Sequence, residues 1–464
     1  MTSREGKVHL SVVICGHVDS GKSTTTGHLL YQLGGISDRD LVALKKLAEE
    51  RGKPSFCFAF FMDTQKEEQE RGITISCTTK EFFTPNYHYT IIDAPGHRDF
   101  MRNMISGASQ ADVGVLMVPA DGGFGVAIQK GDHAAGEVQG QTRQHARLLN
   151  LLGIKQLICC VNKMDSDTAA YSQERFNEIK NEMLSMLQKV GWNKKFVTES
   201  VPVLPISGWK GDNLFQPSTN MPWWTGCKVT KLDNASVEVK TLHDALDLYA
   251  IQPPRNETAA LRMPLSGVYK IKGVGDVVAG RIEQGVIEPG MEVSFIPKHT
   301  ESTACFGKVF SIEMHHQTHP IARPGDNVGL NIKGLDKQNM PKAGDIMVLK
   351  KDTTLKPAKA FSAQVQVLDH PGELKVGYCP TGCVRTSHAP VRLSEIKWKM
   401  SKETGNVKVE NPECLKANEM GEVVFQPQLP FVVEKYDKCE GLGRLAVMDG
   451  NTVYMLGKIT DVQY

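Results

Sequence analysis

The chain has 464 residues, of which 41% are hydrophobic and 23% are charged, and its formal net charge at pH 7 is +2. This length exceeds what one hydrophobic core supports, so we expect roughly three domains. No apolar stretch approaches the roughly 20 residues of a membrane helix. Eleven scattered cysteines without a CxxC pair argue against a disulfide framework or a zinc site. We therefore expect a soluble cytoplasmic protein with no membrane partner.

The first half of the chain alternates short β-branched runs with longer helical stretches. Alternation of this kind predicts a parallel sheet covered by helices. The expected strands are residues 10–15, 89–93, 113–118, 156–161 and 201–206, and the clearest expected helix is 171–190.

The second half of the chain begins with a polar, Pro-bearing connector, "IQPPRNETAALRMP". From there to Tyr464 the sequence shows only short strands separated by Gly, Pro, Asp and Asn, a pattern typical of β-barrels or sandwiches. A second break at "KKDTTLKPAKAF" divides this region in two. We therefore expect three domains, at residues 1–250, 251–353 and 354–464.

The segment "GHVDSGKS" follows the first expected strand and opens a helix. It matches GxxxxGK[ST], a loop whose backbone N–H groups surround the α- and β-phosphates of a nucleotide. Lys22 would reach the β- and γ-phosphates, and Ser23 would hold Mg²⁺ through its hydroxyl. A Gly-rich turn that matches by chance is the alternative, and the loop alone leaves ATP and GTP open. The expected nucleotide-binding residues are Gly16, His17, Val18, Asp19, Ser20, Gly21, Lys22, Ser23 and Thr24.

The tetrapeptide "NKMD" follows a buried strand and therefore projects from the edge of the sheet where ligands bind. The Asp165 carboxylate would accept hydrogen bonds from guanine N1–H and its exocyclic amine, a donor pair that adenine lacks. Asn162 would orient the loop, and the Lys163 stem would cover the base. The alternative is a polar turn that caps the next helix. "PISGWKGDN" would bring Ser207, Gly208 and Trp209 to the same base, so GTP or GDP is the expected nucleotide.

Two segments between these loops are expected to sense the γ-phosphate. "RGITI" contributes Arg71, Gly72, Ile73 and Thr74, with the Thr74 hydroxyl as a second Mg²⁺ ligand. "DAPGH" contributes Asp93, through a metal-bound water, and the Gly96 N–H. Loss of the phosphate would release both segments, as in GTPase switches. The alternatives are an ordinary strand residue for Thr74 and a strand-end cap for Asp93.

The motifs "GHVDSGKST", "RGITI", "DAPGHRDF", "NKMD" and "ISGWKGDN" together resemble the translational GTPases, specifically the elongation factor one alpha family and, within it, the elongation factor-like branch. The resemblance continues through "VYKIKGVGDVVAGRIEQGVIEPGM" and "PGDNVGLNIKG". It implies a multidomain protein with an α/β P-loop GTPase domain followed by two β-barrel domains.

The resemblance also implies a function: GTP-dependent delivery of aminoacyl-tRNA to the ribosome by a monomer that an exchange factor reloads. Asn327 in "RPGDNVG" would belong to the pocket for the aminoacyl end, although "PGDN" is also a tight turn. His97 stands where many GTPases have a glutamine that orients the attacking water. It would act as a neutral acceptor or as a protonated charge stabiliser, and Val18 and Ile73 would form an apolar gate in front of it.

Three other functions fit parts of the sequence. A related decoding GTPase would deliver a release or ribosome-rescue factor, but such proteins usually carry a substantial N-terminal extension. The GTPase subunit of a sulfate-activating enzyme shares the architecture but needs an adenylyl-transferring partner. In an interaction protein such as a cytoskeletal binder, GTP hydrolysis would be vestigial, and the full set of nucleotide motifs argues against this.

Overall fold

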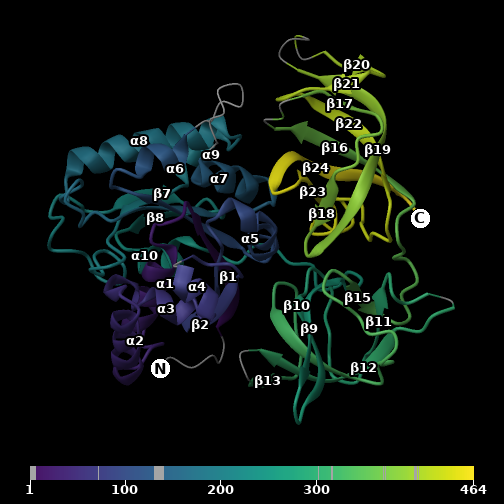
Figure 1. Ribbon diagram of the computed structural model, residues 1–464, viewed down its shortest axis with the longest axis horizontal. Coiled ribbons are helices and arrows are strands. Elements are labelled where there is room, and N and C mark those ends of the chain that lie inside the picture. The colour runs from purple at the N-terminus through teal and green to yellow at the C-terminus, as the bar shows by residue number, and fades with distance from the viewer. Residues whose placement is uncertain are drawn as a thin grey trace. The chain divides into compact units, whose positions relative to one another are not determined.

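The computed structural model describes residues 7–71, 73–129, 140–300, 302–314, 317–368, 370, 372–401, 405 and 407–464. The chain divides into two compact units, Met1–Pro253 and Pro254–Tyr464. Figure 1 shows helices and strands in the first unit and strands in the second. Among the helices of the described residues, none is both long enough and apolar enough to cross a membrane.

The first unit is built on a six-stranded sheet with the order β2-β3-β1-β4-β5-β6. Strands β3, β1, β4, β5 and β6 run parallel. The edge strand β2 pairs antiparallel with β3, because a short turn in which the Thr84 N–H donates to the Tyr87 carbonyl reverses the chain. The sheet is therefore mixed at one edge, where a parallel sheet was expected. The strands are β1 (Val8–Gly16), β2 (Thr78–Phe83), β3 (Tyr87–Asp93), β4 (Val113–Pro119), β5 (Leu157–Asn162) and β6 (Val203–Pro205), with a separate hairpin of β7 (Cys227–Thr230) and β8 (Ser236–Val239).

Helices cover the sheet of the first unit on both faces (Figure 1). The expected helix at 171–190 is α8, which begins after the N-cap Ser172 and buries Phe176, Ile179 and Met183 at helical spacing. The helices and helical turns are α1 (Lys22–Gln32), α2 (Asp38–Glu50), η1 (Pro54–Phe56), α3 (Ala59–Met62), α4 (Lys66–Arg71), η2 (Arg98–Phe100), α5 (Met101–Ala108), α6 (Phe124–Ile128), α7 (Gln141–Leu151), α8 (Gln173–Lys189), α9 (Lys194–Glu199), α10 (Leu242–Asp244) and the π-helical turn η3 (Ala245–Tyr249).

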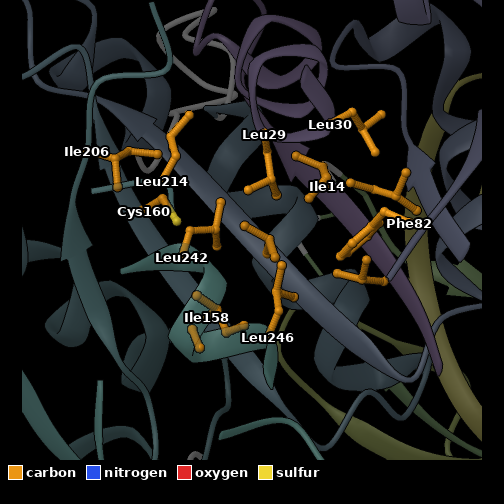
Figure 2. Close-up of a cluster of buried hydrophobic side chains, with 14 of the residues drawn as sticks. Ile14, Leu29, Leu30, Phe82, Ile158, Cys160, Ile206, Leu214, Leu242 and Leu246 are labelled. Atoms are coloured by element: carbon orange, nitrogen blue, oxygen red, sulfur yellow. The ribbon is translucent and has the colours of Figure 1, made fainter. Parts of the chain in front are cut away.

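A continuous apolar core fills the space between one face of this sheet and the helices α1 and η3 (Figure 2). Ile14 and Ile158 come from the sheet, Leu29 and Leu30 from α1, and Leu246 from η3. All five side chains are almost completely buried, so the face of α1 that packs on the sheet is fixed. This packing fixes the start of α1 directly after β1, at the edge of the sheet where strands β1, β3, β5 and β6 end.

The second unit contains two β-barrels. In each, six strands form a closed ring, because a pairing between β11 and β12 closes the first sheet and one between β18 and β19 closes the second. The first barrel comprises β9 (Met263–Ile271), β10 (Gly275–Arg281), β11 (Glu292–Ile296), β12 (Phe306–Met314), β14 (Asn327–Lys333) and β15 (Ile346–Leu349), with β13 (Gln317–His319) added beside β12. The second comprises β16 (Ala360–Val367), β18 (Thr381–Val384), β19 (Ser387–Met400), β22 (Met420–Pro427), β23 (Arg444–Asp449) and β24 (Thr452–Gln463), with β20 (Val409–Glu410) at its edge and a small pair of β17 (Leu374–Lys375) and β21 (Cys414–Leu415).

Buried ion pairs connect the two barrels. Arg262 in the first barrel is 2% exposed, and its guanidinium donates to the carboxylate of Glu434 in the second barrel at 2.8 Å. It also donates at 2.6 Å to Asp352, which follows the last strand of the first barrel. Arg385 in the second barrel donates to Glu283 of the first at 2.7 Å. Because a buried charge is costly without its partner, these pairs hold the barrels together as one unit.

Candidate active site

A cavity of about 430 Å³ lies at the edge of the first unit's sheet where the parallel strands end. Open α/β sheets bind their ligands at this edge. The cavity joins the loop after β1 to the loops after β3, β5 and β6. Of the residues predicted from the sequence, the lining contains Val18, Asp19, Gly21, Lys22, Ser23, Thr24, Ile73, Thr74, Gly96, His97, Asn162, Lys163, Asp165 and Trp209.

The phosphate-loop segment turns sharply before α1. Gly21 is the N-cap of α1 and has a φ of 85°, a left-handed conformation that favours glycine. A Cβ at Gly21 would lie 2.3 Å from the Asn162 side-chain nitrogen, so any other residue would displace Asn162 as well as strain the backbone. No acidic residue occupies the first turn of α1 and no side chain caps it. The N-terminus of α1 therefore presents backbone N–H groups and the positive end of the helix dipole to the cavity.

Lys22 brings a buried positive charge to the cavity. It is 7% exposed, and its ammonium donates to the His17 carbonyl at 2.9 Å. Burial lowers the pKa of Lys22, and the nearby Asp93 carboxylate opposes this shift. A β-carbon added at Gly96 would lie 2.4 Å from the Lys22 nitrogen, so the absence of a side chain at Gly96 leaves room for the lysine. An anion bound in the site would therefore meet a cation that is held in a low-dielectric position.

The start of helix α7 braces the first residues of the phosphate loop. The backbone N–H groups of Gly16, His17 and Val18 donate to His145 Nδ1, Thr142 Oγ1 and Gln141 Oε1, at 3.2, 3.1 and 3.2 Å. These bonds provide acceptors for the backbone N–H groups of the first three residues of the loop. His145 is completely buried, and burial lowers its pKa to about 3, so its imidazole is neutral at pH 7.

The base side of the cavity is a hydrogen-bonded junction of three loops. The Asn162 side chain donates to the Ser20 carbonyl at 2.8 Å and accepts from the Gly208 N–H at 2.8 Å. Ser207 donates to Asp165 Oδ1 at 2.6 Å, which leaves the other carboxylate oxygen free of this bond and orients the group. These contacts join the phosphate loop to the two loops that were expected to read the base.

Two further side chains complete this side. Lys163 has a φ of 63°, and its ammonium donates to Asp121 at 2.8 Å, so the lysine stem is held in one position along the cavity wall. The Asp121 pKa is lowered, because hydrogen bonds from Lys163 and the Gly123 N–H outweigh the effect of burial. Trp209, 39% exposed, also lines the cavity.

Oxygen atoms gather next to the start of α1. Ser23 Oγ lies 3.2 Å from Thr74 Oγ1, which donates to Asp63 Oδ1 at 2.8 Å. Asp93 is completely buried, and neither of its carboxylate oxygens accepts a hydrogen bond from the residues that the structure describes. Burial raises the pKa of both Asp63 and Asp93, and the charge of Asp93 raises that of Asp63 further. Two hydroxyls and two carboxylates that repel each other fit Mg²⁺, a hard cation that takes oxygen ligands.

The backbone near Thr74 is held by a buried carboxylate. Glu68 is completely buried, and its Oε1 accepts from the N–H groups of Ile75, at 2.9 Å, and Ser76, at 3.0 Å. Arg71, which belongs to the expected phosphate-sensing segment, pairs with Glu67 at 2.8 Å on the surface and does not line the cavity. Gly72, expected in the same segment, lies outside the described residues.

His97 lines the cavity. Its side chain is 36% exposed, and its Nδ1 accepts from the Asp99 N–H at 3.3 Å and lies 3.3 Å from Asp99 Oδ2. Val18 and Ile73 line the same cavity. The structure therefore brings the histidine and both expected gate residues to one place.

The remaining predicted residues lie behind the lining or elsewhere. Six of them are absent from the lining: Gly16, His17, Ser20, Asp93, Ser207 and Gly208. All of these except Asp93 make the hydrogen bonds described above. Asn327 begins β14 in the second unit. Sequence reasoning missed Asp63, Glu68, Asp121 and the Gln141, Thr142 and His145 set; the acidic residues shortly before Thr74 were the one available signal for the first two.

This arrangement defines the class: a P-loop domain that binds guanine nucleotides. The family described as Elongation factor Tu GTP binding domain matches residues 7–252. The families described as Elongation factor Tu domain 2 and GTP-eEF1A C-terminal domain-like match residues 275–348 and 360–460. Three consecutive matches thus cover both units.

Whole-length relatives agree with these matches. Elongation factor 1-alpha of Coccidioides immitis (strain RS) is 44% identical over 462 residues, which are 99% of this chain and 95% of that protein. Elongation factor 1-alpha of Onchocerca volvulus is 42% identical over 98% of this chain and 94% of its own length. The solved GTPase-like domain of S. cerevisiae Ski7 shares the fold, with a TM-score of 0.77 at 20% identity over 98% of this chain and 97% of that one.

The chain belongs to the elongation factor 1-alpha family of translational GTPases. It is a GTP-hydrolysing translation elongation factor, and its nucleotide is a guanine nucleotide. The family, the fold class and the elongation GTPase function predicted from the sequence are confirmed.

Proposed function

We propose that this chain binds aminoacyl-tRNA in its GTP·Mg²⁺ state, carries it to the ribosome and releases it after GTP hydrolysis. Family membership across the whole chain supports the role. The single observation that carries the GTP dependence is the approach of Thr74 to Ser23 at the cavity. This contact joins the phosphate loop to the segment expected to respond to the γ-phosphate.

Guanine recognition depends on Asp165. Its carboxylate, oriented by Ser207, accepts from N1–H and the exocyclic amine of the base. Asn162 holds the loop in register with the phosphate loop, while Lys163 and Trp209 cover the two faces of the base. An adenine ring would leave the Asp165 charge unpaired, which excludes ATP.

The phosphates lie at the start of α1. Backbone N–H groups of the residues from Asp19 to Thr24 and the Lys22 ammonium bind the β- and γ-phosphates. Ser23 and Thr74 would hold Mg²⁺ directly, and Asp93 and Asp63 would do so through water. When bound, Mg²⁺ neutralises phosphate charge and orients the triphosphate.

The switch depends on two groups that contact the γ-phosphate or its metal ion. Thr74 contributes its hydroxyl, and Gly96 contributes its N–H. When hydrolysis removes the phosphate, Thr74 loses its contact with the metal ion, and the segment that starts with Arg71, Gly72 and Ile73 becomes free to rearrange.

His97 orients the attacking water. Its Nδ1 faces Asp99, so the opposite ring nitrogen, Nε2, is the one available to a water molecule. Val18 and Ile73 form the apolar gate that separates His97 from the γ-phosphate until the ribosome rearranges the site. Intrinsic hydrolysis is therefore slow, because positioning and charge stabilisation supply most of the catalysis of phosphoryl transfer.

The remaining assignments extend the same proposal. Domains at residues 1–250, 251–353 and 354–464 act together, and Asn327 in the second domain contributes to the pocket for the aminoacyl end. The protein works as a cytoplasmic monomer, and an exchange factor replaces its GDP. The test is a pull-down of charged and uncharged tRNA with GTP or GDP: an aminoacyl-tRNA carrier retains only charged tRNA in the GTP state. A factor that delivers a release or rescue protein would retain neither tRNA.

A further inference from the structure

His28 connects helix α1 to the base-reading loop. Its Nδ1 lies 2.8 Å from the Gly208 carbonyl oxygen, and because that oxygen only accepts, Nδ1 carries the proton. The side chain is 8% exposed, and burial lowers its pKa, so the ring is neutral at pH 7. His28 does not touch the cavity. It acts one layer behind the wall formed by Trp209.

The Phe58 ring covers one face of the His28 ring. The two rings stack with centroids 4.2 Å apart and planes 6° apart, and Phe58 is 7% exposed. The Phe58 ring also meets Trp209 edge-on, with centroids 6.3 Å apart and planes at 72°. A β-carbon at Gly27 would lie 2.1 Å from the Phe58 carbonyl oxygen, so this glycine permits the close approach of the Phe58 backbone to α1.

Phe58 lies within residues 54–63, which we name the covering segment. Ser55, Phe56 and Ala59 of this segment line the nucleotide cavity. At its end, Asp63 accepts from the Thr74 hydroxyl. The covering segment therefore spans the cavity wall between two sets of side-chain contacts. One is the His28, Phe58 and Gly208 contact on the base side, and the other is the Asp63 and Thr74 contact on the phosphate side.

We propose that His28 and Phe58 are positioning residues that clamp the covering segment over the cavity and thereby slow the dissociation of guanine nucleotide. The inference rests on the proposed function only in taking this cavity as the nucleotide site. Outward movement of the segment at Phe58 breaks the ring stack and removes one wall of the cavity. Because His28 also holds Gly208, loss of the stack loosens the base-reading loop at the same time.

The expected effect follows from the contacts that are lost. An aromatic stack and a buried hydrogen bond each contribute about 1 kcal/mol, so removing either speeds dissociation by roughly 5- to 10-fold, and removing both by at most about 100-fold. The two residues act through one contact. The dissociation rate of the double variant His28→Ala with Phe58→Leu is therefore expected to rise by less than the product of the two single-variant increases.

The test measures dissociation of fluorescently labelled GDP by stopped flow from the full chain. Phe58→Leu, which removes the stack alone, is expected to release GDP about 5- to 10-fold faster, and His28→Ala, which removes both the stack and the hydrogen bond to Gly208, at most about 100-fold faster. Phe58→Tyr keeps the stack and the original rate. The matched control is Phe196→Leu, which removes a ring stacked on Trp192 at 5.4 Å, away from the cavity lining. It is expected to leave the rate unchanged. Rates of His28→Ala and Phe58→Leu within twofold of the unmodified chain would overturn the inference.

A measurement on the unmodified chain covers the case in which a variant fails to fold. Hydrogen exchange of residues 54–63 is expected to slow when GDP binds. Exchange in the covering segment that ignores GDP would overturn the inference. Neither experiment contains tRNA, so failure of the aminoacyl-tRNA proposal would appear separately, as absent tRNA retention by a chain whose GDP kinetics behave as described.

Discussion

The hydroxyl oxygens of Ser23 and Thr74 lie 3.2 Å apart although 51 positions separate them in the sequence. Ser23 belongs to α1, which is fixed on the sheet. Thr74 donates to the side chain of Asp63, and the two residues after Thr74 donate their backbone N–H groups to the Glu68 carboxylate. The phosphate-loop helix and the segment that we propose to respond to the γ-phosphate therefore meet at this contact. The following predictions test Thr74 at this contact and three other residues, which line the cavity or lie behind the phosphate loop.

Thr74→Ala should weaken GTP more than GDP. The hydroxyl is proposed to bind Mg²⁺ only while the γ-phosphate is present, so its loss should lower GTP affinity by about 10- to 100-fold and GDP affinity by no more than about threefold. Equilibrium titration with labelled nucleotides at saturating Mg²⁺ measures both. Thr78→Ala, in β2 outside the cavity lining, is the control. Equal losses for GTP and GDP would show that Thr74 has a purely structural role.

Asp165→Asn should change the base that is bound. The variant loses two charge-assisted acceptors for guanine, so GTP binding should fall by roughly 10²- to 10⁴-fold. Xanthine carries a carbonyl where guanine carries the amine, and the new amide can donate to it, so binding of XTP should improve. Asn can still accept from Ser207 through its carbonyl oxygen. Competition binding with GTP, XTP and ATP measures the exchange, and unchanged GTP preference would contradict the role of Asp165.

His97→Ala should separate binding from hydrolysis. The side chain is 36% exposed and makes its polar contacts with Asp99, so its removal leaves the folded domain and GTP affinity nearly intact. Ribosome-stimulated single-turnover hydrolysis should fall by about 10²- to 10⁴-fold, the range for a group that assists proton transfer. His243→Ala, in α10, is the control. An unchanged single-turnover rate in the His97 variant would refute the assignment.

His145 should make stability depend on pH. Burial lowers its pKa to about 3 in the folded chain, against 6.5 for the free side chain. Between these values the unfolded state binds a proton that the folded state does not. Through this residue the free energy of unfolding therefore falls by about 1.4 kcal/mol for each unit by which the pH is lowered. His145→Gln keeps an acceptor for the Gly16 N–H and should flatten this part of the slope.

The measurement is urea unfolding between pH 6.5 and 5 in a Trp398→Phe background. The four other tryptophans then report on Met1–Pro253 alone. The free energy of unfolding of the His145→Gln variant should fall less with decreasing pH than that of its parent. Parallel slopes for the two chains would contradict the neutral, buried state of His145.

Local sequence patterns were sufficient to predict the strands that end at the cavity and the residues that follow them. Each of these motifs combines a buried run with a short polar turn, so the chemistry follows directly from position. The Gln141, Thr142 and His145 set was not predicted, because its meaning depends on α7 reaching a loop 125 residues earlier. At the start of a helix such residues indicate no more than a cap.

Two other differences have the same physical origin. Arg71 fits the phosphate-sensing motif by position, but its guanidinium finds Glu67 one helical turn away on the surface. Asp63 follows an apolar run and carries no motif of its own. Its role appears only when the covering segment folds back along α1 and brings its carboxylate to the Thr74 hydroxyl. The covering segment is short, and its contacts with His28, Trp209 and Thr74 join it to residues far away in the sequence, so sequence periodicity gives no sign of them.

The central claim is that the GTP state, and not the GDP state, holds the aminoacyl end of tRNA. The most direct measurement is the rate of spontaneous hydrolysis of the aminoacyl ester in the presence of this chain. With a non-hydrolysable GTP analogue the ester should be protected, whereas with GDP it should hydrolyse at the rate of free aminoacyl-tRNA. The Asp165→Asn variant with the same GTP analogue should give no protection. Equal protection with GTP analogue and GDP, or none with either, would contradict the account.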